Sequence, residues 1–182
     1  TLRPARAAVI VAAEPAGLPP MMRMSDCITQ SLPDQTWNHY LRTMGHMASM
    51  ELADAIALIR PTDTMAVPLG PGVPGGFMHA LGDRDDYDDL QISGALMPDL
   101  YAVLAKPGVH YRSGFFGPAE RFLRDSGASI DFVPADFRRF EPILQNMRPR
   151  IMATAGSLPV DGWVSLSVHA GATVDEIHRA SA

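Results

Sequence analysis

TDTMAVPLGPGVPGGFMHAL, residues 62–81, joins a short apolar strand to a helix through a glycine-rich loop. The expected strand covers 65–69, and the expected helix begins at Phe77. Glycine lets a backbone turn tightly and approach a ligand closely, and the first N–H groups of a helix point outward with a partial positive charge. The loop therefore predicts a site for an oxyanion or a phosphate. A turn that binds nothing would fit the same residues, and the spacing matches neither a P-loop nor a dinucleotide-binding GxGxxG motif.

The segments around this stretch alternate between apolar runs and helical patterns. We expect helices over 36–47, 49–59, 98–104, 118–125 and 136–144, and further strands over 90–96, 130–133 and 150–154. Such alternation predicts an α/β domain with an open, mostly parallel sheet and helices on both faces. Ligands of such sheets bind at the carboxyl ends of the strands, where the glycine loop falls. The run DRDDYDD, residues 83–89, predicts an acidic surface loop.

The amino-terminal part of the chain has a different composition. Residues 1–23 are rich in Ala, Pro and Arg and show no sustained period. We therefore predict a flexible N-terminal tail over 1–35 and one α/β domain over 36–182. A targeting segment is the alternative for the tail, because Arg3 and Arg6 precede a short apolar stretch.

Composition narrows the classes of partner. The 182 residues carry a net charge of −5, which argues against a nucleic-acid-binding protein. The single cysteine, Cys27, excludes an internal disulfide and favours a cytoplasmic location. The apolar run 7–13 is much shorter than the roughly 18 residues that cross a bilayer, so we expect no membrane contact. The six histidines lack the spacing of a helical metal site, and we expect no metal.

Three blocks of the sequence resemble the N-terminal domain of the acetyl-CoA hydrolase/transferase family, which includes acetate and 4-hydroxybutyrate CoA-transferases. The first is LIRPTDTMAVPLGPGVPGGFMHAL, residues 58–81. The second is VHYRSGFFGPAERF, residues 109–122, in which an Arg precedes two Phe residues and a Gly-Pro. The third is SLPVDGWVSLSVHAGATVDEI, residues 157–177. The similarity extends over about 51–182, and the second block is its most specific part.

The resemblance implies a CoA-transferase domain that forms half of an acyl-CoA transferase or hydrolase. In this family a glutamate of the C-terminal domain attacks the acyl-CoA thioester, and a glutamyl-CoA intermediate follows. We therefore expect the glutamate to come from a second domain or subunit, and this chain to be inactive alone. The expected partners are acyl-CoA and a small carboxylate, with coenzyme A as a substrate and no tightly bound cofactor. We also expect a homo-oligomer. The alternative is a non-catalytic module of the same fold that binds CoA or a phosphorylated metabolite.

The resemblance also names candidate binding residues. They are Gly70, Gly72, Pro74, Gly75, Gly76, Arg112, Phe115, Phe116 and Ser165. The loop residues would present backbone N–H groups to the acyl-CoA. Arg112 would orient a carboxylate or phosphate, or would pair with an acid, and the two Phe residues would form an acyl pocket or belong to the core. Ser165 would lie at a strand end near the cleft, or follow a tight hairpin turn. Glu120 fits the first turn of a helix better than it fits a nucleophile.

Overall fold

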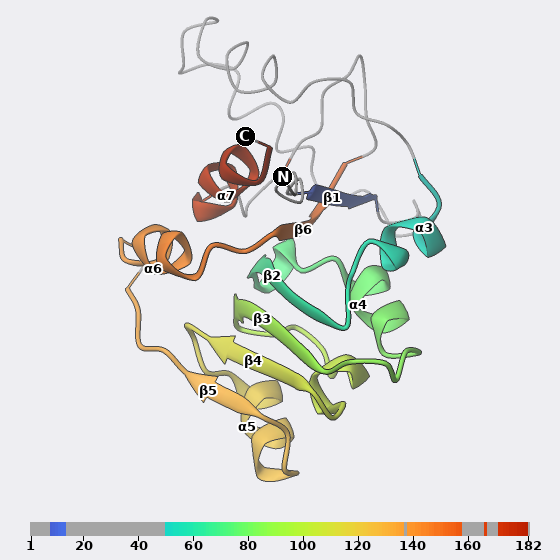
Figure 1. Ribbon diagram of the computed structural model, residues 1–182. Helices are drawn as coiled ribbons and strands as arrows, with labels where there is room; N and C mark the ends of the chain where they lie inside the picture. Colours follow the sequence, from blue (N-terminus) through green and yellow to red (C-terminus); the bar gives the residue numbers. More distant parts are fainter. Residues whose placement is uncertain (1–7, 14–49, 137, 158–165, 167–170, 182) are drawn as a thin grey trace, which may run out of the picture.

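The computed structural model describes residues 8–13, 50–136, 138–157, 166 and 171–181. Within these ranges six strands form one sheet in the order β1-β6-β2-β3-β4-β5, and every neighbouring pair is parallel (Figure 1). The strands are β1 (Ala8–Ala13), β2 (Thr62–Leu69), β3 (Asp89–Ala95), β4 (Val109–Ser113), β5 (Ile130–Phe132) and β6 (Ile151–Gly156). The expected α/β class with a parallel sheet is confirmed.

Helices and short 3-10 turns cover both faces of this sheet (Figure 1). They are α3 (Leu52–Ala57), η1 (Gly70–Gly72), α4 (Gly75–Leu81), η2 (Ala102–Ala105), α5 (Pro118–Asp125), α6 (Phe140–Met147) and α7 (Gly171–Ser181). Successive side chains of a strand point to opposite faces. Met65 of β2 accordingly lies in one core with Phe77 of α4, whereas Ala66 lies in a second, smaller core with Ile177 of α7.

The face beneath α6 and α7 changes character across the sheet. Ala66 of β2 and its register partner Met152 of β6 are apolar and buried on this face. Towards β4 the same face becomes polar, because Ala66 is in register with Ser93, and Ser93 with Arg112. This face is therefore apolar over β2 and β6 and carries polar side chains on β3 and β4, and α6 extends over it as far as Ser93 of β3.

The order of the strands reverses beside β2. Strands β2, β3, β4 and β5 follow one another across the sheet, but β6 returns to the other side of β2. Ligands of open parallel sheets bind outside the carboxyl ends of the strands at such a reversal. The glycine loop leaves the carboxyl end of β2, so the fold places it at this point.

Two segments differ from the sequence-based expectation in their kind of structure. Residues 8–13, which we assigned to a tail, form the edge strand β1 beside β6. The helix expected over 98–104 is only the turn η2. Tyr101, Val103 and Leu104 are all buried, and the N–H of Leu104 donates to Tyr101 O at 3.0 Å, in the 3-10 pattern. Burial of these three side chains decides the conformation of this segment.

Two further differences concern β4 and α6. Strand β4 was not among the expected elements, although it joins β3 to β5. Helix α6 begins at Phe140 and not at Asp136. The Asp136 carboxylate accepts the N–H of Arg138 at 2.9 Å in a turn before the helix, so it caps that turn instead. The helix expected over 36–47 lies outside the described residues.

An ion pair joins the start of β2 to the start of β6. The Arg150 guanidinium donates two hydrogen bonds to the Asp63 carboxylate, one of them 2.8 Å long from Nε to Oδ1. The same carboxylate accepts the backbone N–H groups of Arg60 at 3.0 Å and Thr64 at 2.8 Å. Burial alone would raise the pKa of Asp63, but these hydrogen bonds outweigh it and hold the pKa below its ordinary value of 3.8.

We predict that Asp63→Asn lowers the free energy of unfolding by about 2–3 kcal/mol at neutral pH, because Arg150 loses its charged partner. The pKa of Asp63 is lower in the folded chain than in the unfolded chain. The contribution of the pair is therefore complete above pH 3.8 and is lost as the pH falls through the folded pKa. Urea unfolding of both proteins between pH 7 and pH 3 measures this.

The matched control is Asp125→Asn, which breaks the exposed pair between Arg124 and Asp125. Surface ion pairs contribute little, so we expect a change below about 0.5 kcal/mol at every pH. A constant stability difference between wild type and Asp63→Asn down to pH 3 would contradict the assigned role.

Candidate functional site

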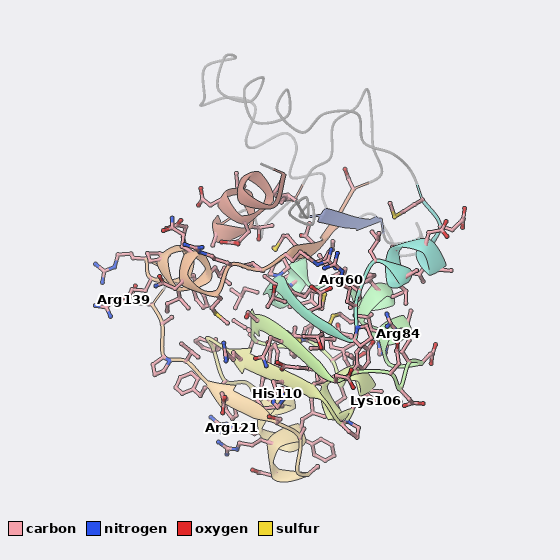
Figure 2. All side chains as sticks on the ribbon, viewed as in Figure 1. Arg60, Arg84, Lys106, His110, Arg121 and Arg139 are labelled. Atoms are coloured by element: carbon pink, nitrogen blue, oxygen red, sulfur yellow. The ribbon has the colours of Figure 1, made fainter. Side chains whose placement is uncertain are left out.

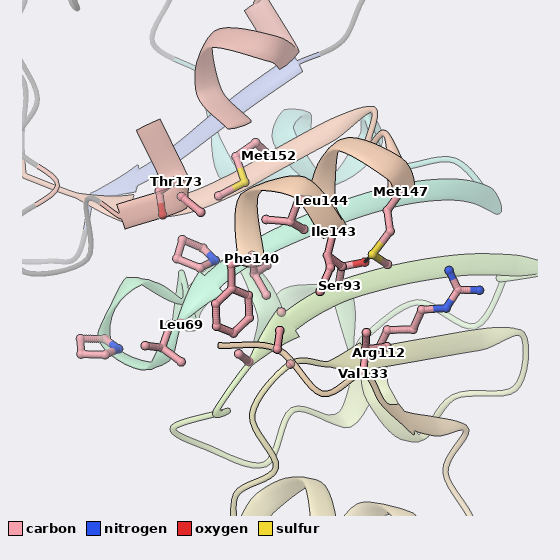
Figure 3. A pocket seen from close by; sticks show the side chains of 18 residues that line it. Leu69, Ser93, Arg112, Val133, Phe140, Ile143, Leu144, Met147, Met152 and Thr173 are labelled. Atoms are coloured by element: carbon pink, nitrogen blue, oxygen red, sulfur yellow. Dashed lines mark hydrogen bonds between the residues drawn. The ribbon is translucent and has the colours of Figure 1, made fainter. Parts of the chain in front are cut away.

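A cavity of about 260 Å³ lies at the carboxyl ends of β2, β3 and β4, with α6 over it (Figure 3). It is lined by Val67, Pro68, Leu69, Pro71, Ser93, Gly94, Ala95, Arg112, Gly114, Val133, Ala135, Phe140, Ile143, Leu144, Met147, Met152, Ala172 and Thr173. The cavity therefore occupies the reversal point of the sheet, where the fold class places ligands. Its roof comes from α6, and the first turn of α7 closes one side.

The lining is mostly apolar, and the hydroxyls of Ser93 and Thr173 are its polar side chains besides Arg112. Arg112 is the single charged residue among the described residues that line the cavity. Its stem reaches the lining, but in Figure 3 its guanidinium extends past Met147 and away from Phe140. The Ser93 hydroxyl lies 3.5 Å from Met147 Sδ, its weak acceptor. The cavity thus suits an apolar group and offers no charged partner inside.

Arg112 is exposed, and no described side chain pairs with it. The sequence left two roles open for this residue, and pairing with an acid is not observed among the described residues. Its register partner on β5 is Asp131, but no ion pair joins the two. The guanidinium is therefore available to an anion outside the cavity.

The glycine loop runs beside the cavity, but its glycines do not line it. Leu69 and Pro71 reach the lining, whereas none of the five candidate residues of the loop does. Gly70 and Gly72 are buried in η1, and Gly70 has a φ of +47°, which disfavours any side chain. Gly76 is exposed, with no atom within 4 Å of the position that a Cβ would take. The open side of the loop is therefore at Gly76.

The two adjacent Phe side chains, Phe115 and Phe116, point to different environments, as expected for neighbouring residues of an extended segment. Phe115 is 52% exposed, and Phe116 packs against the main core. The Phe116 ring lies edge-on to Phe132 at 5.7 Å, and the Arg124 guanidinium lies 4.8 Å from its centroid. Neither Phe lines the cavity. Ser165 lies outside the described residues.

Glu120 is fully buried and organises the loops at this end of the sheet. Its carboxylate accepts the N–H groups of Met97 at 2.7 Å and Gly117 at 3.0 Å. The Ser113 hydroxyl lies 3.3 Å from the same carboxylate and closer, at 2.8 Å, to Phe115 O. Glu120 therefore ties the loop after β3 to the loop after β4 and to the start of α5. Burial chiefly, together with the nearby charge of Glu120, raises the pKa of Tyr111 well above its ordinary value. This role agrees with a structural carboxylate.

The apolar residues of α6 are the part of the site that the sequence reasoning missed. Phe140, Ile143, Leu144 and Met147 all line the cavity. Their spacing of i, i+3, i+4 and i+7 is that of one face of a helix. The sequence therefore carried a signal for a shared apolar face, but not for what that face covers.

Basic side chains do not gather at the cavity. Of the Lys, Arg and His residues labelled in Figure 2, none lines the cavity, and Lys106 pairs with Asp85 at 2.6 Å. The described residues contain no group of three or more His, Cys, Asp or Glu side chains that could hold a metal ion. Among the same residues, no helix combines the length and hydropathy that spanning a bilayer requires.

We predict opposite effects for two alanine substitutions in the glycine loop. Gly70→Ala places a Cβ on a backbone with φ of +47° and lowers the free energy of unfolding by about 1–2 kcal/mol. Gly76→Ala lies in α4, with open space around it, and raises stability by about 0.5–1 kcal/mol. Thermal and urea unfolding of the two variants measures the difference, and an equal effect of both would contradict this geometry.

We predict that Glu120→Ala lowers the free energy of unfolding by about 3 kcal/mol or more, because the buried N–H groups of Met97 and Gly117 lose their acceptor and the side chain leaves a cavity. Glu51→Ala is the control, because Glu51 is exposed and its side chain makes no capping hydrogen bond to α3. We expect that control to stay within about 0.5 kcal/mol of wild type. Equal stability of the two variants in urea would rule out the structural role of Glu120.

Comparison with known proteins identifies no relative of this chain. No family model, curated protein or solved structure matches the chain. The function therefore has to be inferred from the cavity, from the loop beside it, and from the resemblance of the three sequence blocks.

Proposed function

We propose that the chain is the N-terminal half of an acyl-CoA transferase or acyl-CoA hydrolase. The complete enzyme would move CoA between carboxylic acids, or would hydrolyse acyl-CoA, through a glutamyl-CoA intermediate. The observation that carries this proposal is the apolar cavity at the carboxyl ends of β2, β3 and β4, beside the glycine loop. A cavity of this kind would hold the acyl group of a thioester or of a free carboxylate.

The glutamates of the chain support a nucleophile from outside it. The described glutamates are Glu51, Glu120, Glu141 and Glu176, and none of them lines the cavity. Glu120 lies within the second block and Glu176 within the third, and both are buried. The two carboxylate oxygens of Glu120 already accept the backbone N–H groups of Met97 and Gly117. A glutamate from a second domain or subunit therefore fits the site better than any of these four.

The chemistry of such a glutamate balances without a further reactant. The carboxylate attacks the thioester carbonyl, the C–S bond breaks, and an acyl-glutamyl anhydride and CoA thiolate form. The thiolate then attacks the glutamyl carbonyl, which releases the acyl group as a carboxylate and leaves glutamyl-CoA. Backbone N–H groups must stabilise the oxyanion of each step. The open side of the glycine loop at Gly76 would face that oxyanion.

Two residues of the β4 segment would contribute outside the cavity. Arg112 has a free guanidinium, which would attract the acceptor carboxylate or a phosphate of CoA. Phe115 is exposed and would contact the pantetheine arm or the second domain. The proposal also includes a cytoplasmic location. It includes a homo-oligomer, because β5 is an edge strand with Phe132 52% exposed, and such edges favour association.

We predict that the chain alone releases no CoA from acetyl-CoA or longer acyl-CoA thioesters, because its nucleophile is missing. Addition of a second polypeptide of the family's C-terminal type should start CoA transfer and make the mixture sensitive to hydroxylamine and borohydride. Borohydride should then reduce one glutamate of the second polypeptide, which peptide mass spectrometry identifies.

Two outcomes would decide against this proposal. Turnover by the chain alone would show that the nucleophile is in this polypeptide. CoA binding with no trapped thioester, even in the presence of the second polypeptide, would favour a non-catalytic CoA-binding module of the same fold. A glutamate-to-glutamine variant of the second polypeptide is the matched control and should abolish both transfer and trapping.

A further inference from the structure

We infer that the cavity beneath α6 receives an apolar acyl chain of roughly six to ten carbon atoms, and is not built for an acetyl group. The inference rests on the proposed function, since only that function identifies the ligand as an acyl group. It adds the substrate class, which neither the sequence blocks nor the loop indicates.

The volume of the cavity is the first argument. An apolar cavity of about 150 Å³ lined by Leu, Ile and Phe is known to bind benzene, which has six carbons. The cavity beneath α6 measures about 260 Å³, so it would hold roughly ten carbons at the same density. An acetyl group has two carbons and would leave most of this space without contacts. Such unfilled space forfeits dispersion and hydrophobic energy on every wall.

The chemistry of the walls is the second argument. The roof is the α6 face made by Phe140, Ile143, Leu144 and Met147, and the opposite wall includes Val67 and Met152. Two of these wall residues are methionines, whose flexible thioethers adapt to chains of different shape. A hydroxylated or dicarboxylic substrate would lose water without gaining hydrogen bonds on these walls. These walls therefore favour a hydrocarbon chain over a dicarboxylic one, and the Ser93 and Thr173 hydroxyls are the uncharged polar side chains of the lining.

The position of charge is the third argument. Among the described residues that line the cavity Arg112 alone is charged, and in Figure 3 its guanidinium extends away from the cavity. The carboxyl carbon of a fatty acid would then stay at the rim, because a carboxylate inside would have no partner. A reactive carbon at the rim is where an external glutamate could reach it.

The test measures binding of a series of sodium carboxylates to the purified chain by isothermal titration calorimetry. The series is acetate, butyrate, hexanoate, octanoate and decanoate, which share one head group. Each added methylene should strengthen binding by about fourfold until the chain fills the cavity, and affinity should then level off. Octanoate should bind with a stoichiometry near one, and acetate should show no measurable binding.

Variants of the roof distinguish this cavity from adventitious binding elsewhere. Ile143→Trp fills the cavity and should weaken octanoate binding at least tenfold. Ala135→Phe fills it from the loop before α6 and should do the same, so that a folding defect of one variant does not decide the result. Asn146→Trp is the matched control, because Asn146 is exposed on the same helix and does not line the cavity. It should bind octanoate as wild type does.

Three results would overturn the inference: no increase of affinity with chain length, acetate binding as tight as octanoate binding, or equal octanoate affinity in Ile143→Trp and Asn146→Trp. The measurement needs no CoA and no second polypeptide. The two proposals can therefore fail independently. The absence of a trapped thioester would contradict the proposed function, whereas the absence of chain-length dependence would contradict the assignment of an acyl chain to the cavity.

Discussion

The pairing of Asp63 with Arg150 is the constraint on which the site depends. Strand β6 follows β5 in the sequence, yet it must cross the sheet to lie beside β2. The ion pair holds the two strands together at their starts, and the Arg150 N–H also donates to Thr64 O at 2.9 Å. Met65 and Ile151 then come into register, and Ala66 with Met152. The ion pair thus lies at the start of the two strands between which the order reverses, and the cavity lies towards their carboxyl ends.

A second set of interactions shapes the carboxyl ends of the neighbouring strands β3 and β4. Glu120 draws the loops after β3 and β4 together through backbone N–H groups, so these loops depend on one buried carboxylate. Leu96 in the first of these loops has a φ of +49°, and its N–H donates to Phe115 O at 3.0 Å. The two loops are therefore held as one unit, and Phe115 is presented outward by backbone geometry. A buried or partly buried carboxylate therefore lies at each end of this sheet, in addition to the apolar core.

Much of the fold was predictable from local pattern, and the site was not. The segments 62–81 and 118–125 form the expected strand, turn and helices, because glycine and proline mark their boundaries. Strand β4 could have been predicted, because the apolar residues Val109 and Tyr111 alternate with the polar residues His110 and Arg112. The apolar face of α6 could be predicted from its spacing. Its position over the cavity could not, because the residues that face it lie on β2 and β6, far away in the sequence. The role of Glu120 was equally hidden, since Met97 is 23 residues away.

None of the eight residues of α6 is fully buried, although four of them line the cavity. The helix also ends at Arg148 in a left-handed conformation with φ of +46°, followed at once by a proline. Because its side chains are only partly buried, α6 exposes little additional apolar area when it separates from the sheet. The free energy of this local opening is correspondingly small. The central strands β2 and β3, by contrast, hold side chains at 0% exposure such as Met65 and Ile92, so their opening would expose far more apolar area. The wall formed by α6 is therefore expected to move more easily than the wall formed by the sheet. The width of the cavity can vary with the position of α6, while the strands keep theirs.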